Sequence, residues 1–162
     1  LMLMFMGKPK TVYAKMHTKT HDIEIDDTGI VAVEFQNGAF GSLNYTTSAI
    51  KKNVEGTVAL FYENGTIKIG GEHLNEIELF NVNGMDSPDY KESIVEGNDY
   101  GTYKGSASNH DSVFKAIVAM EQNNIEEHDL IEKLVTGEEG VMGIRFMEKA
   151  VEAAQSGAVM EY

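Results

Sequence analysis

Two short segments carry the side chains best suited to hold an anionic ligand, and the first is Lys51-Lys52-Asn53. It holds the only adjacent pair of basic residues in the chain. Ammonium and amide groups there would donate hydrogen bonds to a phosphate or a carboxylate. The same lysine pair would also keep an exposed turn at a sheet edge soluble, and on spacing alone this second interpretation is favoured.

The second segment is Ser108-Asn109-His110-Asp111, which resembles a capping box at the start of a helix. Unpaired N–H groups and the helix dipole favour an anion at such a position, so Asn109 and His110 are candidates to contact one. An ordinary surface cap is the competing interpretation, and the local pattern favours it.

Other chemistry has weaker support in the sequence. Of the five histidines only His17 and His21 have a His-x-x-x-His spacing, and they fall in an expected strand rather than on a helix. Cysteine is absent, and no Gly-x-Gly-x-x-Gly or Walker loop occurs. The acidic stretch from His21 to Asp27 is interpreted as a strand end leading into a turn rather than a cation site, because Ile23 and Ile25 alternate as core residues would. We therefore expect no metal site and no cofactor site in this chain.

Composition favours one domain with a real core, since 42% of the 162 residues are hydrophobic and 24% are charged. No apolar run is long enough to span a bilayer. The net charge of -13 argues against nucleic acid or an anionic membrane as a partner. The absence of cysteine suits the cytoplasm.

Strand patterns fill the first half of the chain. Asn37-Gly38 and Asn64-Gly65 each separate two β-rich runs, which is a strong hairpin signal. The expected strands are 11–21, 29–36, 39–49, 57–63, 66–69 and 77–82. About six strands with short links predict an open, mostly antiparallel sheet. Residues 84–107 have no period and predict a long loop containing Tyr90, Tyr100 and Tyr103.

Helix signals follow the strands, which predicts an α+β fold with helices packed on one face of the sheet. The last helix is expected to begin at Thr136, through a capping box with Glu139, and to end at Gly157. Its expected buried face consists of Val141, Ile144, Met147, Val151 and Ala154. Because apolar residues occur on both faces of several strands, the outer face of the sheet is predicted to self-associate.

The opening run Leu1–Met6 is apolar and is stopped by Gly7 and Pro9, as at the end of a helix. No N-cap or polar face precedes it. We interpret it as the last turns of a longer helix, which predicts that the chain is a fragment of a larger protein.

An ordered set of motifs resembles the C-terminal domain of the glucose–fructose oxidoreductase, inositol dehydrogenase and MocA family. These motifs are Asp27-Thr28-Gly29, the run from Glu34 to Leu43, Gly65–Ile69 and Gly137-Glu138-Glu139-Gly140. Asn44–Gly56, Ile69-Gly70-Gly71 and Ser108–Asp111 further resemble the nucleotide-sugar branch, whose members oxidise the 3-hydroxyl of UDP-N-acetylglucosaminuronate-like substrates with NAD.

The resemblance implies that residues 1–162 are the substrate and oligomerisation domain of a longer NAD(P)-dependent oxidoreductase. The family's Rossmann domain, its Glu-Lys-Pro lysine and its Asp-x-Gly-x-His-x-x-Asp motif are absent from this sequence. Within this setting the substrate-facing candidates become Lys51, Lys52, Asn53, Asn109 and His110. The competing functions are a non-enzymatic scaffold that self-associates through its sheet and a free-standing sugar-binding domain.

Overall fold

The computed structural model describes residues 1–51, 54–71, 74, 76–88, 110–122 and 135–162. The elements in chain order are α1 (Met2–Met6), β1 (Pro9–His17), β2 (Thr28–Phe35), β3 (Phe40–Thr46), β4 (Val58–Tyr62), β5 (Gly65–Gly70), β6 (Glu76–Val82), α2 (His110–Glu121), α4 (Gly137–Ser156) and β7 (Met160–Glu161). Contacts divide the chain into two units, and the first combines Leu1–Ala49 with Val135–Tyr162 while the second is Ile50–Leu134.

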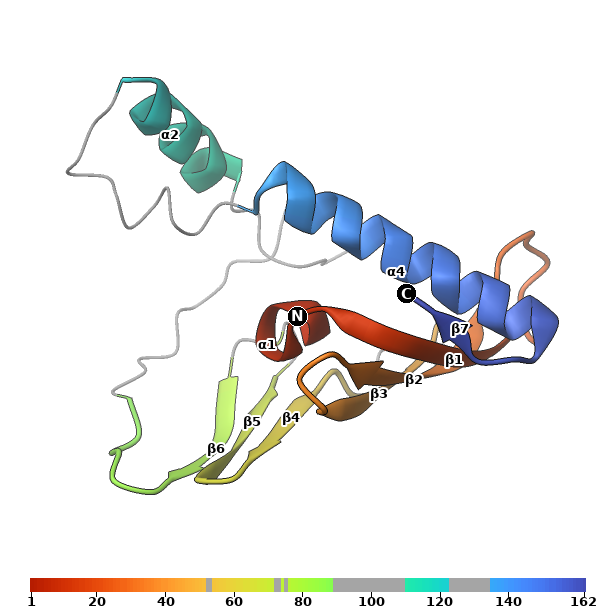
Figure 1. The fold of residues 1–162 in the computed structure, drawn as a ribbon, viewed down its shortest axis with the longest axis horizontal. Helices are drawn as coiled ribbons and strands as arrows, with labels where there is room; N and C mark the ends of the chain where they lie inside the picture. Colours follow the sequence, from red (N-terminus) through yellow and green to blue (C-terminus); the bar gives the residue numbers. More distant parts are fainter. Residues whose placement is uncertain (52–53, 72–73, 75, 89–109, 123–134) are drawn as a thin grey trace. The chain divides into compact units, whose positions relative to one another are not determined.

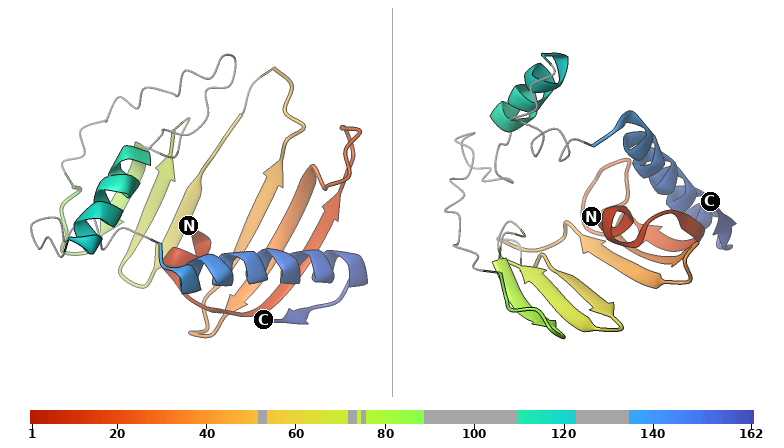
Figure 2. Two further views of the ribbon diagram at one scale, coloured as in Figure 1. Left: turned by 90° about the horizontal axis from the view of Figure 1, so that it is seen from above. Right: turned by 60° about the vertical axis from the view of Figure 1, so that its left-hand side comes forward.

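The first unit contains a four-stranded sheet in the order β3-β2-β1-β7 (Figures 1 and 2). All of its strand pairs are antiparallel. The link between β2 and β3 is the predicted Asn37-Gly38 hairpin, where Gly38 takes a positive φ of 85° that few other residues adopt. The two-residue β7 was not predicted, because so short a strand has no period to detect.

Helix α4 lies along one face of this sheet (Figure 1). The core between them holds Val12, Ala14, Val31, Val33, Phe35, Phe146, Ala150 and Ala153. The prediction of the packed helix face was wrong for four of its five residues, because Val141, Ile144, Met147 and Val151 are all exposed. Only Ala154 is half-buried against the core. The face that packs carries one large side chain and two alanines, and small residues let the helix backbone come close to the sheet.

Both predicted ends of α4 are confirmed. The Thr136 hydroxyl accepts a hydrogen bond from the Glu139 amide (3.2 Å), and the Glu139 carboxylate accepts one from the Thr136 amide (2.8 Å). Gly157 closes the helix in the left-handed conformation. Beyond it, the Tyr162 hydroxyl donates to the Met142 carbonyl, so the chain after β7 is tied back to the helix.

The second unit contains a three-stranded antiparallel sheet in the order β4-β5-β6 (Figure 2). One side of this sheet carries apolar residues from all three strands, among them Leu60, Ile67 and Phe80, which lie opposite one another. The other side carries an ion pair between Lys68 and Glu78 at 2.6 Å, whose attraction raises the pKa of Lys68.

The predicted open antiparallel α+β fold is therefore confirmed, with two differences. The described residues form seven strands rather than about six, and these strands lie in two sheets rather than one. Among the described helices, none is both long enough and apolar enough to cross a membrane.

Candidate functional site

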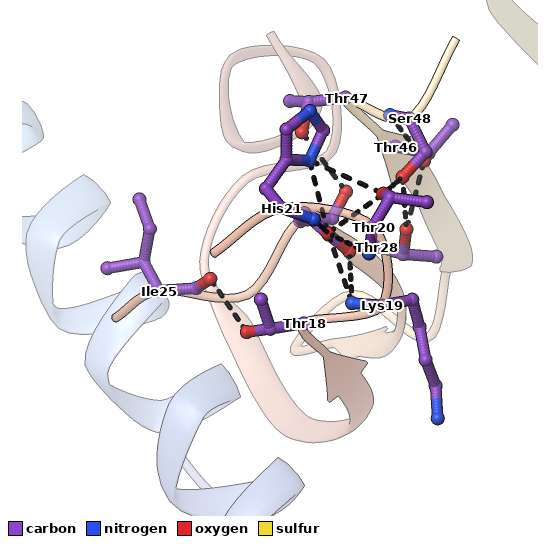
Figure 3. A network of polar contacts seen from close by, with 10 residues as sticks. Thr18, Lys19, Thr20, His21, Ile25, Thr28, Thr46, Thr47 and Ser48 are labelled. Atoms are coloured by element: carbon purple, nitrogen blue, oxygen red, sulfur yellow. Dashed lines mark hydrogen bonds and ion pairs between the residues drawn. The ribbon is translucent and has the colours of Figure 1, made fainter. Parts of the chain in front are cut away.

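The first unit contains a cluster of polar side chains and backbone amides where β1 and β3 end and β2 begins (Figure 3). Its centre is Asp27, whose side chain is buried and whose residue is only 1% exposed. Asp27 directly precedes β2, and its amide donates to the carbonyl of His17 at the end of β1 (3.1 Å). The loop from Thr18 to Asp26 therefore leaves and rejoins the sheet at one point.

The carboxylate of Asp27 accepts hydrogen bonds from three successive backbone amides of this loop. The amide of Thr20 lies 2.8 Å from Oδ2, that of Lys19 lies 3.0 Å from both carboxylate oxygens, and that of His21 lies 3.1 Å from Oδ2. These donors favour the ionised form, the Thr20 amide most of all, and they hold the pKa of Asp27 far below its usual range although burial opposes the shift.

Two side chains also lie within hydrogen-bonding distance of this carboxylate. The Thr20 hydroxyl donates to Oδ2 at 3.0 Å, and Nδ1 of His21 lies 3.2 Å from the same oxygen. The Thr20 hydroxyl also contacts the Ser48 hydroxyl, as Figure 3 shows. A buried carboxylate thus reaches a surface loop and, through Thr20, the segment that follows β3.

The end of β3 is fixed to the same point by its backbone. The amide of Thr47 donates to the Asp27 carbonyl at 2.9 Å, and the hydroxyls of Thr28 and Thr46 lie 2.9 Å apart across the β2–β3 pair. We call Asp27, Thr20, Thr47 and Ser48 together the Asp27 cluster. Its arrangement fixes backbone geometry, and although the Thr20 hydroxyl also lies 3.3 Å from Nδ1 of His21, both groups are engaged with the Asp27 carboxylate.

The sequence reasoning missed Asp27 and misjudged its neighbourhood. Ile23 and Ile25, which were expected to be core residues, are 46% and 72% exposed. The expected turn is present, but it is held by a carboxylate rather than by apolar packing. The signal that could have found it is an Asp immediately before a Thr-Gly strand start, with Thr and Ser near it on both flanking segments.

The structure describes only part of the predicted substrate surface. Lys51 is exposed and takes a positive φ of 73°, one of two described non-glycine residues that do so. Such a conformation costs roughly 1–3 kcal/mol, and conformations of this kind cluster at functional sites. Lys52, Asn53 and Asn109 lie outside the described residues. His110 begins helix α2.

Residues 52–53 and 108–109 and the Tyr90–Tyr103 loop lie outside the described residues, so the predicted cleft between residues 48–53 and 108–110 stays a prediction. No group of three or more His, Asp or Glu side chains capable of holding a metal occurs in the part of the chain that the structure describes. The described sheets are wholly antiparallel, so the described residues offer no parallel βαβ unit for a dinucleotide.

An open antiparallel sheet covered on one face by a long helix is an α+β fold. Comparison with known proteins shows which domains have a similar sequence or fold. Residues 1–68 match the family model of the GFO/IDH/MocA C-terminal domain. The predicted resemblance to this domain is confirmed over these residues. No curated protein matches the chain.

Solved structures of low sequence identity share the fold. The WlbA dehydrogenase of Bordetella pertussis, solved with NADH and UDP-GlcNAcA, has a TM-score of 0.75 at 22% identity, and the match covers 100% of this chain and 41% of that one. WlbA from Chromobacterium violaceum, solved with the same two ligands, gives 0.66 at 21% identity, covering 100% and 42%. An inositol dehydrogenase homologue from Azotobacter vinelandii, complexed with NADH and myo-inositol, gives 0.61 at 16%, covering 96% and 44%. This chain therefore spans about two fifths of the length of the proteins it resembles.

Proposed function

We propose that the chain is the substrate-binding and oligomerisation domain of an NAD(P)-dependent sugar or nucleotide-sugar dehydrogenase. The observation that carries this proposal is the match of the whole chain to 41% of a WlbA dehydrogenase whose structure holds NADH and UDP-GlcNAcA. The family match over residues 1–68 supports it. In this proposal the chain acts together with a Rossmann domain elsewhere in a longer, cytoplasmic polypeptide.

The reaction we propose is oxidation of a sugar hydroxyl, at C3 of a UDP-sugar acid, with NAD or NADP as the hydride acceptor. This sequence contains no Gly-rich dinucleotide loop, and the described strands pair only antiparallel, so the cofactor does not fit here. The proposed role of this chain is therefore confined to holding the sugar nucleotide. We expect the isolated chain to be inactive.

The substrate would be an anion, and a chain with a net charge of -13 must hold it with local donors. We propose that these donors are Lys51, Lys52, Asn53, Asn109 and His110. The exposed, positive-φ backbone at Lys51 supports this choice, since strain of that kind persists only where the surroundings hold it. Screening by salt limits the opposing effect of the distant acidic residues.

The function is tested by kinetics of the full-length enzyme with UDP-GlcNAcA and NAD. Replacing Lys52 or His110 by alanine should raise the KM for the sugar nucleotide by the equivalent of roughly 1–3 kcal/mol, the contribution of a charge-assisted hydrogen bond. The KM for NAD should stay nearly unchanged. Lys8→Ala, which removes an exposed lysine just before β1, is the control. Wild-type enzyme that does not oxidise UDP-GlcNAcA would refute the proposed substrate.

The isolated chain supplies a second test, by calorimetry with NAD and with NADH. We expect no heat of binding, since the chain has no dinucleotide loop. A dissociation constant in the micromolar range would contradict the proposal that this chain binds the sugar nucleotide while a separate Rossmann domain binds the cofactor.

Self-association is proposed for the outer face of the four-stranded sheet, opposite α4. Tyr13, Ile30 and Phe40 are exposed on neighbouring strands of this face. Leu43, by contrast, pairs with the buried Val31 and so points to the α4 side. A stable interface would bury more than about 1,000 Å² in total.

Sedimentation of two matched isoleucine variants tests this interface. Ile30→Glu places a charge on the outer face and should shift the chain toward monomer. Ile25→Glu changes an even more exposed isoleucine in the Thr18–Asp26 loop and should leave the assembly unchanged. A monomeric wild-type chain at tens of micromolar would refute the interface.

A further inference from the structure

The chain contains three Asn-Gly pairs in different surroundings, Asn37-Gly38, Asn64-Gly65 and Asn83-Gly84. In such a pair the backbone nitrogen of the glycine can attack the side-chain amide of the asparagine, because glycine has no side chain to obstruct the approach. The attack needs a free glycine N–H, a free asparagine carbonyl and a free asparagine amino group that can leave. The hydrogen bonds of each pair therefore indicate whether it can react.

At Asn37-Gly38 each of these groups is hydrogen-bonded. The Gly38 amide donates to the Phe35 carbonyl at 3.0 Å. The Asn37 side chain donates to the Met6 carbonyl at 3.2 Å and accepts from the Ala39 amide at 3.0 Å. A reaction here requires these bonds to open together, and opening each one costs roughly a two- to tenfold factor in an equilibrium.

Asn64-Gly65 is restrained by strand pairing. Gly65 is the first residue of β5, and it pairs with Tyr62 of β4 and with Val82 of β6. A Cβ added to Gly65 would lie 2.7 Å from the Asn81 carbonyl oxygen, so neighbouring backbone packs closely around this glycine. The Gly65 amide therefore turns toward the Asn64 side chain only when this part of the sheet opens.

Asn83-Gly84 lies in an exposed turn just after β6. The Met85 amide donates to the Val82 carbonyl at 3.2 Å, which closes the turn around the two residues. Gly84 takes a positive φ of 76°, and a Cβ built on it would meet nothing within 4 Å beyond its chain neighbours. Among the described residues, none accepts a hydrogen bond from the Gly84 amide and none is bonded to the Asn83 side chain. The reacting groups are therefore accessible in the folded state.

We propose that Asn83 is a site of spontaneous deamidation in the folded protein. The Gly84 nitrogen forms a bond to Asn83 Cγ, and the bond from Cγ to the side-chain nitrogen breaks. The proton of the Gly84 amide passes through solvent to the departing group, which leaves as ammonia, and a five-membered succinimide ring remains. Water then opens the ring at either carbonyl and gives aspartate or isoaspartate, with no oxidation or reduction.

Either product changes the turn. Both add a carboxylate to a chain whose net charge is already -13. Isoaspartate also moves one methylene group from the side chain into the main chain, so the hydrogen bond from Met85 to Val82 no longer fits. The Asn83 amide, which donates to the Asn64 carbonyl at 2.8 Å, is displaced with it. The modification is therefore expected to loosen the end of β6 and its contact with the β4–β5 turn.

Peptide mapping by mass spectrometry tests this site in the full-length protein, incubated in warm and mildly alkaline buffer. In the folded protein, conversion at Asn83 should be at least about tenfold faster than at Asn37 or Asn64, because only those two pairs must first lose hydrogen bonds or strand pairing. In concentrated urea the three rates should agree within about threefold, since the unfolded chain protects none of them. Asn83→Gln keeps a side-chain amide but would have to close a larger ring, so it should abolish the fast conversion.

Several outcomes would overturn the proposal. Equal rates at Asn83 and Asn37 in the folded protein would do so, and so would conversion at Asn64 as fast as at Asn83. A preference for Asn83 that persists unchanged in urea would show that the neighbouring sequence, rather than the fold, selects the site. In the purified isoaspartate form the Met85 amide should exchange its hydrogen faster, and unchanged exchange would refute the loosening of the turn. None of these measurements depends on the proposed substrate.

Discussion

Replacing Phe146 by alanine should destabilise the first unit strongly, because this ring is the one large side chain that α4 places in the core. It is 9% exposed, and its companions on the packed face, Ala150 and Ala153, leave little else to hold the helix on the sheet. Truncation of a buried phenylalanine costs about 3–5 kcal/mol. The residual exposure places Phe146 near the lower end, at about 3 kcal/mol.

The matched control is the next residue along the helix. Met147 is 55% exposed, so Met147→Ala should change the free energy of unfolding by no more than about 0.5 kcal/mol. Urea unfolding followed by circular dichroism measures both variants. For a chain of this size, about 3 kcal/mol corresponds to a fall in Tm of roughly 6–12 °C.

This pair of variants distinguishes two models of the helix. The sequence pattern favours the stripe that contains Val141, Ile144 and Met147 as the buried face, whereas the structure buries the stripe that contains Phe146. A larger loss in Met147→Ala than in Phe146→Ala would refute the packing described here. Equal losses would mean that both stripes are covered in the folded protein.

Two further predictions concern the Asp27 cluster and the sheet next to it. The pKa of Asp27 is lowered in the folded state, so its contribution to stability is complete above its ordinary value of 3.8 and is lost as the pH falls toward the lower folded-state pKa. In urea unfolding between about pH 6 and pH 3, Asp27→Asn should therefore reduce the fall in the free energy of unfolding on the acid side. Asp22→Asn, which changes an exposed acid of the same loop, should leave that fall unchanged. Gly29→Ala would place a Cβ 2.5 Å from Tyr45 Cε1 and should cost about 1–3 kcal/mol. In the Tyr45→Ala background most of that cost should disappear in the same unfolding assay, and strictly additive effects would count against the close contact.

The hairpins were predictable because their signals are local. Asn37-Gly38 lies in the β2–β3 link as predicted. The second turn differs by one residue, because its two central residues are Glu63 and Asn64, whereas Gly65 already belongs to β5. The capping box of α4 was predictable for the same reason, since Thr136 and Glu139 satisfy each other within one turn.

The packed face of α4 was not predictable from periodicity, because the helix carries two apolar stripes. Val141, Ile144 and Met147 are the more hydrophobic set, but the sheet accepts the set with alanines, which allows a closer approach. Asp27 was missed for a related reason. The Asp27 carboxylate and carbonyl hold the structure together only because two segments separated in sequence both donate hydrogen bonds to this residue. No local sequence pattern predicts such contacts. The candidate donors Lys51, Lys52, Asn53, Asn109 and His110 remain predictions.

The division of the first unit into two stretches of sequence has a consequence for how it folds. Strands β1, β2 and β3 can pair through short links, but α4 reaches them only after the whole of Ile50–Leu134 has been synthesised. The entropy lost in closing a loop grows slowly, by about 0.6 kcal/mol for each doubling of its length, so the intervening unit costs little in equilibrium stability. The intervening unit has a larger effect on the folding rate, because contacts between residues far apart in sequence form slowly. We therefore expect the sheet to form first with its apolar face uncovered, and the arrival of Phe146 to be the slow step that protects it.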